Sequence, residues 1–269
     1  MDETNLDQLK ARIGDFLQSH RSKTQEIASK LSNIFEAYCY VLFVLHYEQE
    51  GLKPRIENLT PDKQFKFRFS TAGHPWNFSY FSVRRADNED EVLFEIRHNQ
   101  QVAGHYVKMD EKSEEDIGLF ALDVAVVKPG ALPRLAMGTK RNGERTYVTN
   151  NALITFGEAK KLVAYPMLIA SFYGVVHEIR PVFLEKATQD EEFEKFPHPY
   201  PILFTSDFLT RGTKNILKTF EDRQLRVTVV ENVNASPESV LLRRIKGIRE
   251  DEPLNSRIEE ALDEITNSA

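Results

Sequence analysis

The chain has 269 residues and a formal net charge of −6, and 41% of its residues are hydrophobic while 28% are charged. This balance is typical of a globular chain with a sizeable core, and it argues against proteins that coat nucleic acids, which are basic. The single cysteine, Cys39, excludes an internal disulfide framework, and the longest uncharged apolar run, residues 37–45, is too short to span a bilayer. The first ten residues are too acidic and polar for a secretory signal. We therefore expect a cytoplasmic protein without a membrane segment.

Residues 1–50 have helical spacing and predict two helices. Apolar residues recur at helical intervals in residues 6–17 and again in residues 27–45, with a break near residues 19–24. The second segment is apolar almost all round after Tyr38, so we expect this helix to lie at the centre of the fold. Gly51 is a suitable terminator for it.

Residues 51–184 predict a core rich in β-strands. Phe65, Phe67 and Phe69 alternate with polar residues, the period of a half-buried strand. Residues 91–97 and 102–109 predict a hairpin that turns at residues 99–101. Two strands follow at 119–127 and 153–160, separated by an exposed excursion at 128–151. A helix is predicted within 161–177 and a strand at 181–184. Pro166 is unfavourable inside that helix, so a kink or a later start is expected.

Residues 185–249 predict a C-terminal αβ extension, and residues 250–269 form an acidic tail. The extension contains strands at 202–205 and 225–233, a helix at 210–222 between them, and a helix that starts at Ser236-Pro237-Glu238. No linker divides the chain. The expected fold is one α/β domain with a mixed central sheet flanked by helices, N-terminal helices and a C-terminal αβ extension.

The strands at 119–127 and 153–160 carry charge where a buried strand should have none. The first has Asp123 in its middle, and the second ends in Glu158-Ala159-Lys160. Residues two apart share a face of a strand, so Glu158 and Lys160 converge with Asp123 if the two strands are neighbours. Two carboxylates suit Mg²⁺, which polarises a phosphate and lowers the pKa of a bound water. The pattern predicts a site for phosphodiester cleavage, with Asp123, Glu158 and the Ala159 carbonyl as metal ligands and Lys160 orienting or activating the water.

This motif is weak by itself, because a second copy, Asp110-Glu111-Lys112, lies in a polar acidic run where a solvated loop explains it better. Glu158-Ala159-Lys160 differs because it ends an apolar strand, and burying unpaired charge is costly. The alternative explanation of Glu158-Ala159-Lys160 is a strand end whose charged side chains are exposed to solvent. For Asp123 the alternative is a buried carboxylate that caps a loop or pairs with an arginine.

Four segments in chain order resemble the PD-(D/E)xK nuclease superfamily, over about residues 30–180: IFEAYCYVLFVL, FEIRHNQQVAGHYV, LFALDVAVVK and LITFGEAKKL. The resemblance implies a restriction-endonuclease-like fold that hydrolyses DNA, or less often RNA, with Mg²⁺ or with Mn²⁺ as a substitute. It implies that Asp123 and Glu158 are metal ligands, that Lys160 is the catalytic lysine, and that Glu36 is the acidic residue of the first core helix facing the site. Glu95 is a weaker candidate, with surface charge as its alternative. Leu122 stands where the family often has proline.

Several basic residues are candidates for contact with nucleic-acid phosphates. For the candidates in the excursion, which also contains Arg134, the alternative explanation is a solvated hairpin. For the candidates after residue 160, it is a helix cap or a solvated helix face. The candidates are Lys161, Arg141, Arg145, Arg211 and Lys214. His105 and His177 are better explained as structural residues, and the sequence contains no zinc spacing, Walker loop or dinucleotide fingerprint.

The expected function is therefore that of a Mg²⁺-dependent endonuclease with DNA as its preferred nucleic acid. The resemblance adds a role in restriction or antiviral defence, as a homodimer or with partner subunits of a defence complex. Two alternatives stay open: a non-catalytic scaffold or nucleic-acid-binding subunit with the same fold, and an RNA-directed or ligand-activated nuclease.

Overall fold

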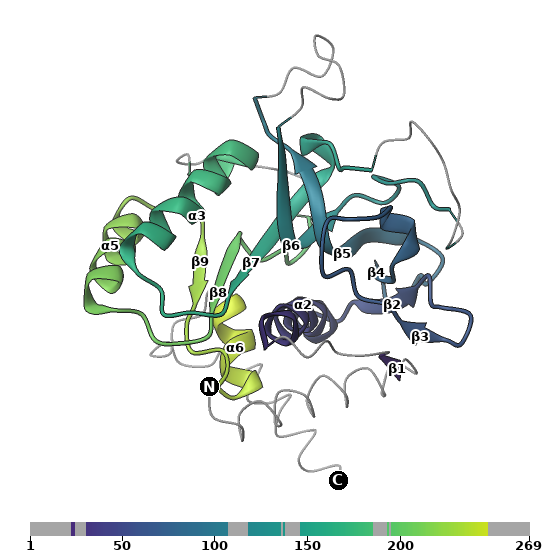
Figure 1. Ribbon diagram of the computed structural model, residues 1–269, viewed down its shortest axis with the longest axis horizontal. Helices are drawn as coiled ribbons and strands as arrows, with labels where there is room; N and C mark the ends of the chain where they lie inside the picture. The colour runs from purple at the N-terminus through teal and green to yellow at the C-terminus, as the bar shows by residue number, and fades with distance from the viewer. Residues whose placement is uncertain are drawn as a thin grey trace.

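The computed structural model describes residues 23–24, 31–106, 118–135, 137, 146–184, 193 and 195–246. A seven-stranded sheet runs through them in the order β2-β4-β5-β6-β7-β8-β9 (Figure 1). Its strands are β2 (Lys53–Glu57), β4 (Tyr80–Arg84), β5 (Val92–Ala103), β6 (Leu119–Val127), β7 (Leu153–Lys160), β8 (Ile202–Thr205) and β9 (Thr228–Val230). A separate two-stranded sheet pairs β1 (Lys23–Thr24) with β3 (Gln64–Phe65). The predicted mixed α/β class is confirmed.

Pairing within the large sheet changes from antiparallel to parallel at β7. The neighbours from β2 to β7 are antiparallel, whereas β8 runs parallel to β7 and β9 runs parallel to β8. Parallel neighbours need a crossover connection, which α3 (Pro166–Ile179) and α5 (Arg211–Asp222) provide. The C-terminal ends of β7 and β8 therefore meet at the same edge of the sheet.

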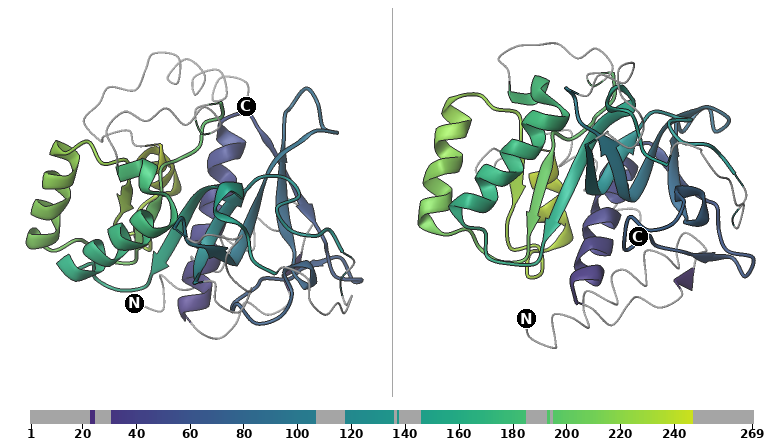
Figure 2. Two further views of the ribbon diagram at one scale, coloured as in Figure 1. Left: turned by 90° about the horizontal axis from the view of Figure 1, so that it is seen from above. Right: turned by 45° about the horizontal axis from the view of Figure 1, so that its top comes forward.

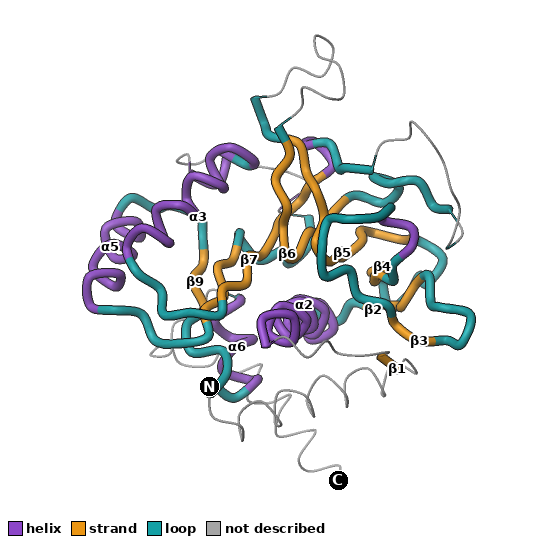
Figure 3. Tube along the Cα trace, viewed as in Figure 1, coloured by secondary structure: helices purple, strands orange, loops and turns teal. Residues whose placement is uncertain are grey.

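Helices lie on both faces of the sheet (Figure 3). On one face, α2 (Leu31–Gln49) lies across the middle of the sheet next to β5, β6 and β7, with α6 (Glu238–Ile245) beside it (Figure 2). Gly157 of β7 faces α2 so closely that a Cβ atom there would come within 2.6 Å of Phe43 Cε2. The adjacent Phe156 points to the opposite face and packs against Phe172 of α3. These two contacts establish which face each side chain of β7 occupies.

The central position predicted for the second helix is confirmed. Side chains of α2 from Ile34 to Val44 are buried, apart from Glu36, which is half-buried. The helix ends at Gln49, and Gly51 follows with a φ of +78°, a conformation that costs glycine little. The predicted helix in residues 6–17 and the acidic tail at 250–269 lie outside the described residues.

The predicted hairpin at residues 91–109 is wrong where the structure describes it. Residues Val92–Ala103 form one continuous strand, β5, which pairs with β6 from Glu95 to Ala103. Asn99 has a φ of +49° and is left out of the ladder, but the register is the same on both sides of it, so the turn-like polar run produces a local irregularity and not a reversal. This run remains in the strand because its side chains find buried partners: His98 Nδ1 lies 2.7 Å from the Arg68 carbonyl, and Gln100 accepts a hydrogen bond from Arg68.

Other predicted boundaries also change. Helix α3 begins at Pro166, in the first turn, where proline needs no partner for a main-chain N–H, so the later start is correct. The predicted strand at 181–184 is wrong, because these residues form the short helix η4 (Pro181–Leu184). The strands predicted at residues 65–69 and 225–233 shorten to β3 and β9. The remaining short helices are η1 (Pro75–Asn77) and η3 (Asn150–Ala152).

Over the described ranges, no helix has the length and apolarity required to cross a bilayer.

Candidate active site

The candidate site lies where the ladder between β6 and β7 ends. The last paired residues are Val124 and Gly157, and beyond them carboxylates take over as partners of the main chain. The Asp123 N–H donates to Glu158 Oε2 (3.4 Å), and the Ala159 N–H donates to Asp123 Oδ2 (2.7 Å). Each carboxylate therefore bonds to the opposite strand. These reciprocal bonds hold both acids at the point where the strands separate.

Lys160 completes the cluster. Its Nζ lies 3.0 Å from Glu158 Oε1 and 3.6 Å from Asp123 Oδ2. The lysine is not at a frayed end, because it pairs with Thr205 of β8 and its carbonyl accepts from the Ser206 N–H (3.2 Å). The structure thus brings together the three side chains that the sequence pattern singled out, and it fixes the backbone beneath them on both sides.

Glu36 approaches this cluster from α2. Its Oε2 accepts a hydrogen bond from Asn99 Nδ2 (3.4 Å), the residue of β5 that is left out of the ladder with β6. Burial, together with the negative charge of Asp123, raises the pKa of Glu36 to about 7, although Asn99 and Lys160 oppose the shift. The charge of Asp123 also adds to the effect of burial in raising the pKa of the Cys39 thiol on α2. The carboxylates of β6 and α2 therefore lie within electrostatic reach of each other.

The electrostatics are those of crowded negative charge around one cation. Burial raises the pKa of Glu158, and repulsion by Asp123 adds to the rise. Burial alone would lower the pKa of Lys160, but the charges of Glu158 and Asp123 outweigh it and raise the pKa. Lys160 is therefore protonated at neutral pH, and the site carries acids that bind protons more readily than usual.

The donor set fits a small hard cation. Two carboxylates suit Mg²⁺, which keeps several waters when protein-bound. The Ala159 N–H points toward Asp123, and because the N–H and C=O of a strand residue point to the same side, the Ala159 carbonyl also faces β6. Repulsion between the acids would be relieved by a divalent cation. Among the described residues no group of three or more His, Cys, Asp or Glu side chains is arranged around one metal position, so the fit rests on two carboxylates and a carbonyl.

Glu36 is expected to make the stability of the metal-free protein depend on pH. Its folded-state pKa of about 7 lies above the ordinary value of 4.5, so the folded state holds this proton more tightly than the unfolded state. The resulting stabilisation is complete below the ordinary pKa and is lost as the pH rises through about 7. Glu158 contributes in the same direction. The substitution Glu36→Gln keeps an acceptor for Asn99. Urea unfolding of this variant in EDTA should show a smaller loss of stability than the wild-type protein as the pH rises from 4.5 through about 7. An unchanged pH profile would contradict the assignment.

The structure separates the candidates for contact with nucleic acid. Lys161 follows β7, and Arg211 begins α5, whose start packs against the start of α3 at Pro166, so both lie at the edge where Lys160 is found. Lys214 is instead held 3.0 Å from Glu231. Arg141 and Arg145 lie outside the described residues.

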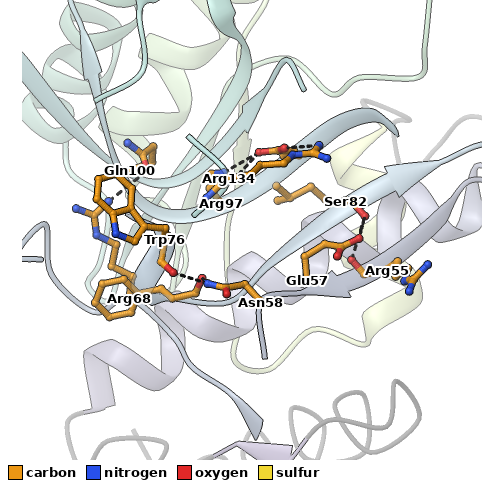
Figure 4. Close-up of polar contacts among 12 residues, drawn as sticks. Arg55, Glu57, Asn58, Arg68, Trp76, Ser82, Arg97, Gln100 and Arg134 are labelled. Carbon is orange, nitrogen blue, oxygen red and sulfur yellow. Dashed lines mark hydrogen bonds and ion pairs between the residues drawn. The ribbon is translucent and has the colours of Figure 1, made fainter. Parts of the chain in front are cut away.

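Glu95 is not surface charge, and that alternative is wrong. Its side chain is fully buried, and it forms ion pairs with Arg97 (2.7 Å) and Arg134 (2.9 Å), whose guanidinium groups are drawn in Figure 4. Sequence reasoning missed Arg97 and the buried Arg68. The available signal was the one that revealed Asp123, namely charge within an alternating apolar strand. The two histidines form contacts elsewhere, His105 with Asn150 and His177 with Glu178.

Comparisons with protein-family models, with curated proteins and with solved structures found no match to this chain. The geometry of the site and the chemistry of its residues are therefore the basis for a functional proposal.

Proposed function

We propose that the protein is a metal-dependent nuclease that hydrolyses phosphodiester bonds at Asp123, Glu158 and Lys160. The observation that supports this most strongly is the cluster at the end of the β6–β7 ladder. The buried carboxylate of Asp123 and the partly buried carboxylate of Glu158 are each bonded to the opposite strand, and one protonated lysine lies within 3.6 Å of both. A purely structural ion pair would need only one of these acids, whereas two crowded acids, of which Glu158 has a raised pKa, are typical of functional sites.

The fold we propose is restriction-endonuclease-like. The mixed sheet, the central helix that carries Glu36, and the two charged strands in their chain order support this proposal, together with the resemblance over about residues 30–180. A role in restriction or antiviral defence, a homodimer or partner subunits, and DNA as the preferred substrate rest on that resemblance alone.

In the proposed mechanism each residue has one task. Mg²⁺, or Mn²⁺ in its place, would be held by Asp123, Glu158 and the Ala159 carbonyl, and the bound ion would supply Lewis acidity and a water of lowered pKa. Lys160 keeps its proton, so it donates hydrogen bonds to a phosphate oxygen or to the attacking water and does not act as a base. Glu36 has a pKa near neutrality and is held through Oε2 by Asn99, so its carboxylate is suited to accept a proton.

A cleavage assay tests the proposal. Purified protein would be incubated with plasmid DNA, linear single-stranded DNA and RNA, each with Mg²⁺, with Mn²⁺ or with EDTA. We expect cleavage with either metal, none in EDTA, and DNA as the better substrate. Cleavage of RNA alone would favour the RNA-directed alternative. If no substrate is cut with any metal, the non-catalytic scaffold replaces the nuclease as the best explanation.

A further inference from the structure

A second polar site lies on the sheet, away from the cluster at Lys160. It is a pocket of about 280 Å³ between β2, β4 and β5 on one side and residues 133–135 of the excursion on the other. Its lining includes Glu57, Trp76, Tyr80, Arg97, Arg134 and Leu135. Figure 4 shows the labelled residues of this region, with Arg97 and Arg134 close together and Trp76, Asn58 and Glu57 along one side.

The pocket opens on the same face of the sheet as the carboxylate of Glu158. Phe81 of β4 packs against Tyr40 of α2, so its neighbour Tyr80 points to the opposite face. In β7, Gly157 faces α2, so Glu158 also points away from that helix. Both sites are therefore accessible from the side of the sheet that lies opposite α2.

Arginine side chains give this pocket an excess of positive charge. The buried Glu95 accepts from Arg97 through Nε (2.9 Å) and Nη2 (2.7 Å), and from Arg134 through Nη2 (2.9 Å). One carboxylate thus serves two guanidinium groups. Glu57, the acid that lines the pocket itself, is balanced by Arg84 at 3.0 Å. The surplus is unusual in a chain whose net charge is −6.

A third guanidinium strengthens the local positive potential. Arg68 is buried and bonds to Gln100 (3.2 Å) and to the Thr71 carbonyl (2.7 Å) (Figure 4). Burial lowers its pKa to about 10, and the positive charge of Arg97 contributes to the shift. Arg68 nevertheless remains charged at neutral pH. The two arginines therefore repel each other, and a bound anion would relieve this repulsion.

The arginines are also oriented for recognition. The guanidinium carbon of Arg97 lies 3.8 Å from the centroid of the Tyr80 ring, and its side chain is only 4% exposed, so its orientation is fixed before any ligand arrives. Glu95 occupies Nε and Nη2 of Arg97 but leaves Nη1 without a partner among the described residues. Arg134 is half exposed and offers its remaining N–H groups to the pocket.

We propose that this pocket binds a phosphate group through Arg97, Arg134 and the hydroxyl of Tyr80. Guanidinium groups match the geometry of phosphate oxygens, and a rigid arginine loses little entropy on binding. The volume of about 280 Å³ is just below the range of drug-sized ligand pockets, which begins at about 300 Å³, and suits a ligand as small as a phosphate with its sugar. The phosphate chemistry does not depend on cleavage. The further statement that the phosphate belongs to the substrate strand rests on the proposed function.

The test compares two variants that each remove one cation from an ion pair with a glutamate. Arg134→Gln leaves Glu95 paired with Arg97, and Lys53→Gln is the matched control, because Lys53 pairs with Glu89 on the surface at 2.6 Å. Binding of fluorescein-labelled single-stranded DNA is measured by anisotropy in EDTA, and binding of AMP and inorganic phosphate by calorimetry. We expect about tenfold weaker binding of DNA to Arg134→Gln, a slope of log affinity against log salt smaller by about 0.7, and no change in Lys53→Gln.

The outcomes distinguish the sources of the phosphate. Weaker binding of DNA alone identifies the substrate strand as the ligand, whereas weaker binding of AMP or phosphate as well identifies a site for a free nucleotide or anion. Tyr80→Phe, which keeps the ring beneath Arg97, should weaken the same probes by less. Unchanged affinity of Arg134→Gln for all three probes, or no binding of any probe by the wild-type protein, would overturn the proposal. Because binding is measured in EDTA, a protein that binds but never cuts would refute only the proposed nuclease.

Discussion

Replacing Lys160 with alanine is expected to lower the rate of Mg²⁺-dependent cleavage by about 10²–10⁴-fold, the range for loss of one group that assists proton transfer or stabilises charge. The Nζ of Lys160 lies 3.0 Å from Glu158 and 3.6 Å from Asp123, and its raised pKa keeps it charged at neutral pH. No other residue of β7 carries an ammonium group, because the strand ends at Lys160. Initial rates on the best substrate of the cleavage assay provide the measurement.

A matched control comes from the chain itself. Lys112 belongs to the second copy of the motif, Asp110-Glu111-Lys112, which lies outside the described residues, and Lys112→Ala should cleave at the wild-type rate. Asp123→Asn should also lose cleavage, while keeping an oxygen that can accept from the Ala159 N–H. Because this substitution removes repulsion between acids, the melting temperature in EDTA should be unchanged or higher. The site assignment fails if Lys160→Ala and Asp123→Asn both retain wild-type cleavage, or if Lys112→Ala loses it.

Glu95→Ala is expected to destabilise the fold by about 3–5 kcal/mol, because it leaves a buried arginine without its counter-charge. Glu95 is fully buried and accepts three hydrogen bonds, two from Arg97 and one from Arg134. Arg97 is only 4% exposed, so water cannot replace most of the interaction with Glu95, whereas Arg134 is half exposed. Urea unfolding followed by circular dichroism gives the free energy, provided that the slope with denaturant is unchanged.

Two further variants separate loss of charge pairing from loss of packing. Glu89→Ala removes the acid of an exposed pair with Lys53, and stability should hardly change, since surface pairs contribute little. Combining Glu95→Ala with Arg97→Met removes both buried charges and should recover much of the lost stability. If Glu95→Ala alone proves as stable as Glu89→Ala, the buried charge network does not hold this part of the sheet together.

The strands that carry the candidate site were predictable because their signals are local. Leu119–Val127 and Leu153–Lys160 are apolar runs of strand length, and the structure has them with the predicted bounds. Charge inside such runs was itself informative, since burying it is costly without partners. The same reasoning could have identified Arg97, which lies in an equally apolar alternation. The nuclease activity, its metal and its nucleic acid remain predictions.

Interpretation failed where the partners of a segment are distant in the chain. The polar run at residues 98–101 has the composition of a turn, yet it continues β5 because Arg68, far away in sequence, bonds to both His98 and Gln100. Lys214 has the spacing of a residue that tracks a phosphate backbone, but the fold sets it beside Glu231. Side-chain identity at one position does not reveal which groups the tertiary structure brings within bonding distance.

The sequence by itself therefore determined the two strands of the candidate site and the kinds of residue on them, because periodicity and charge are properties of neighbouring residues. Only the tertiary structure decided how Asp123 and Glu158 meet. Their carboxylates bond across the gap between β6 and β7, a contact that spans about 35 residues of chain. It also decided that the buried Glu95 and Arg97 and the half-exposed Arg134 form a charge network beside a pocket. The physical reason is that such pairings depend on strand order and register, which a short stretch of sequence does not encode.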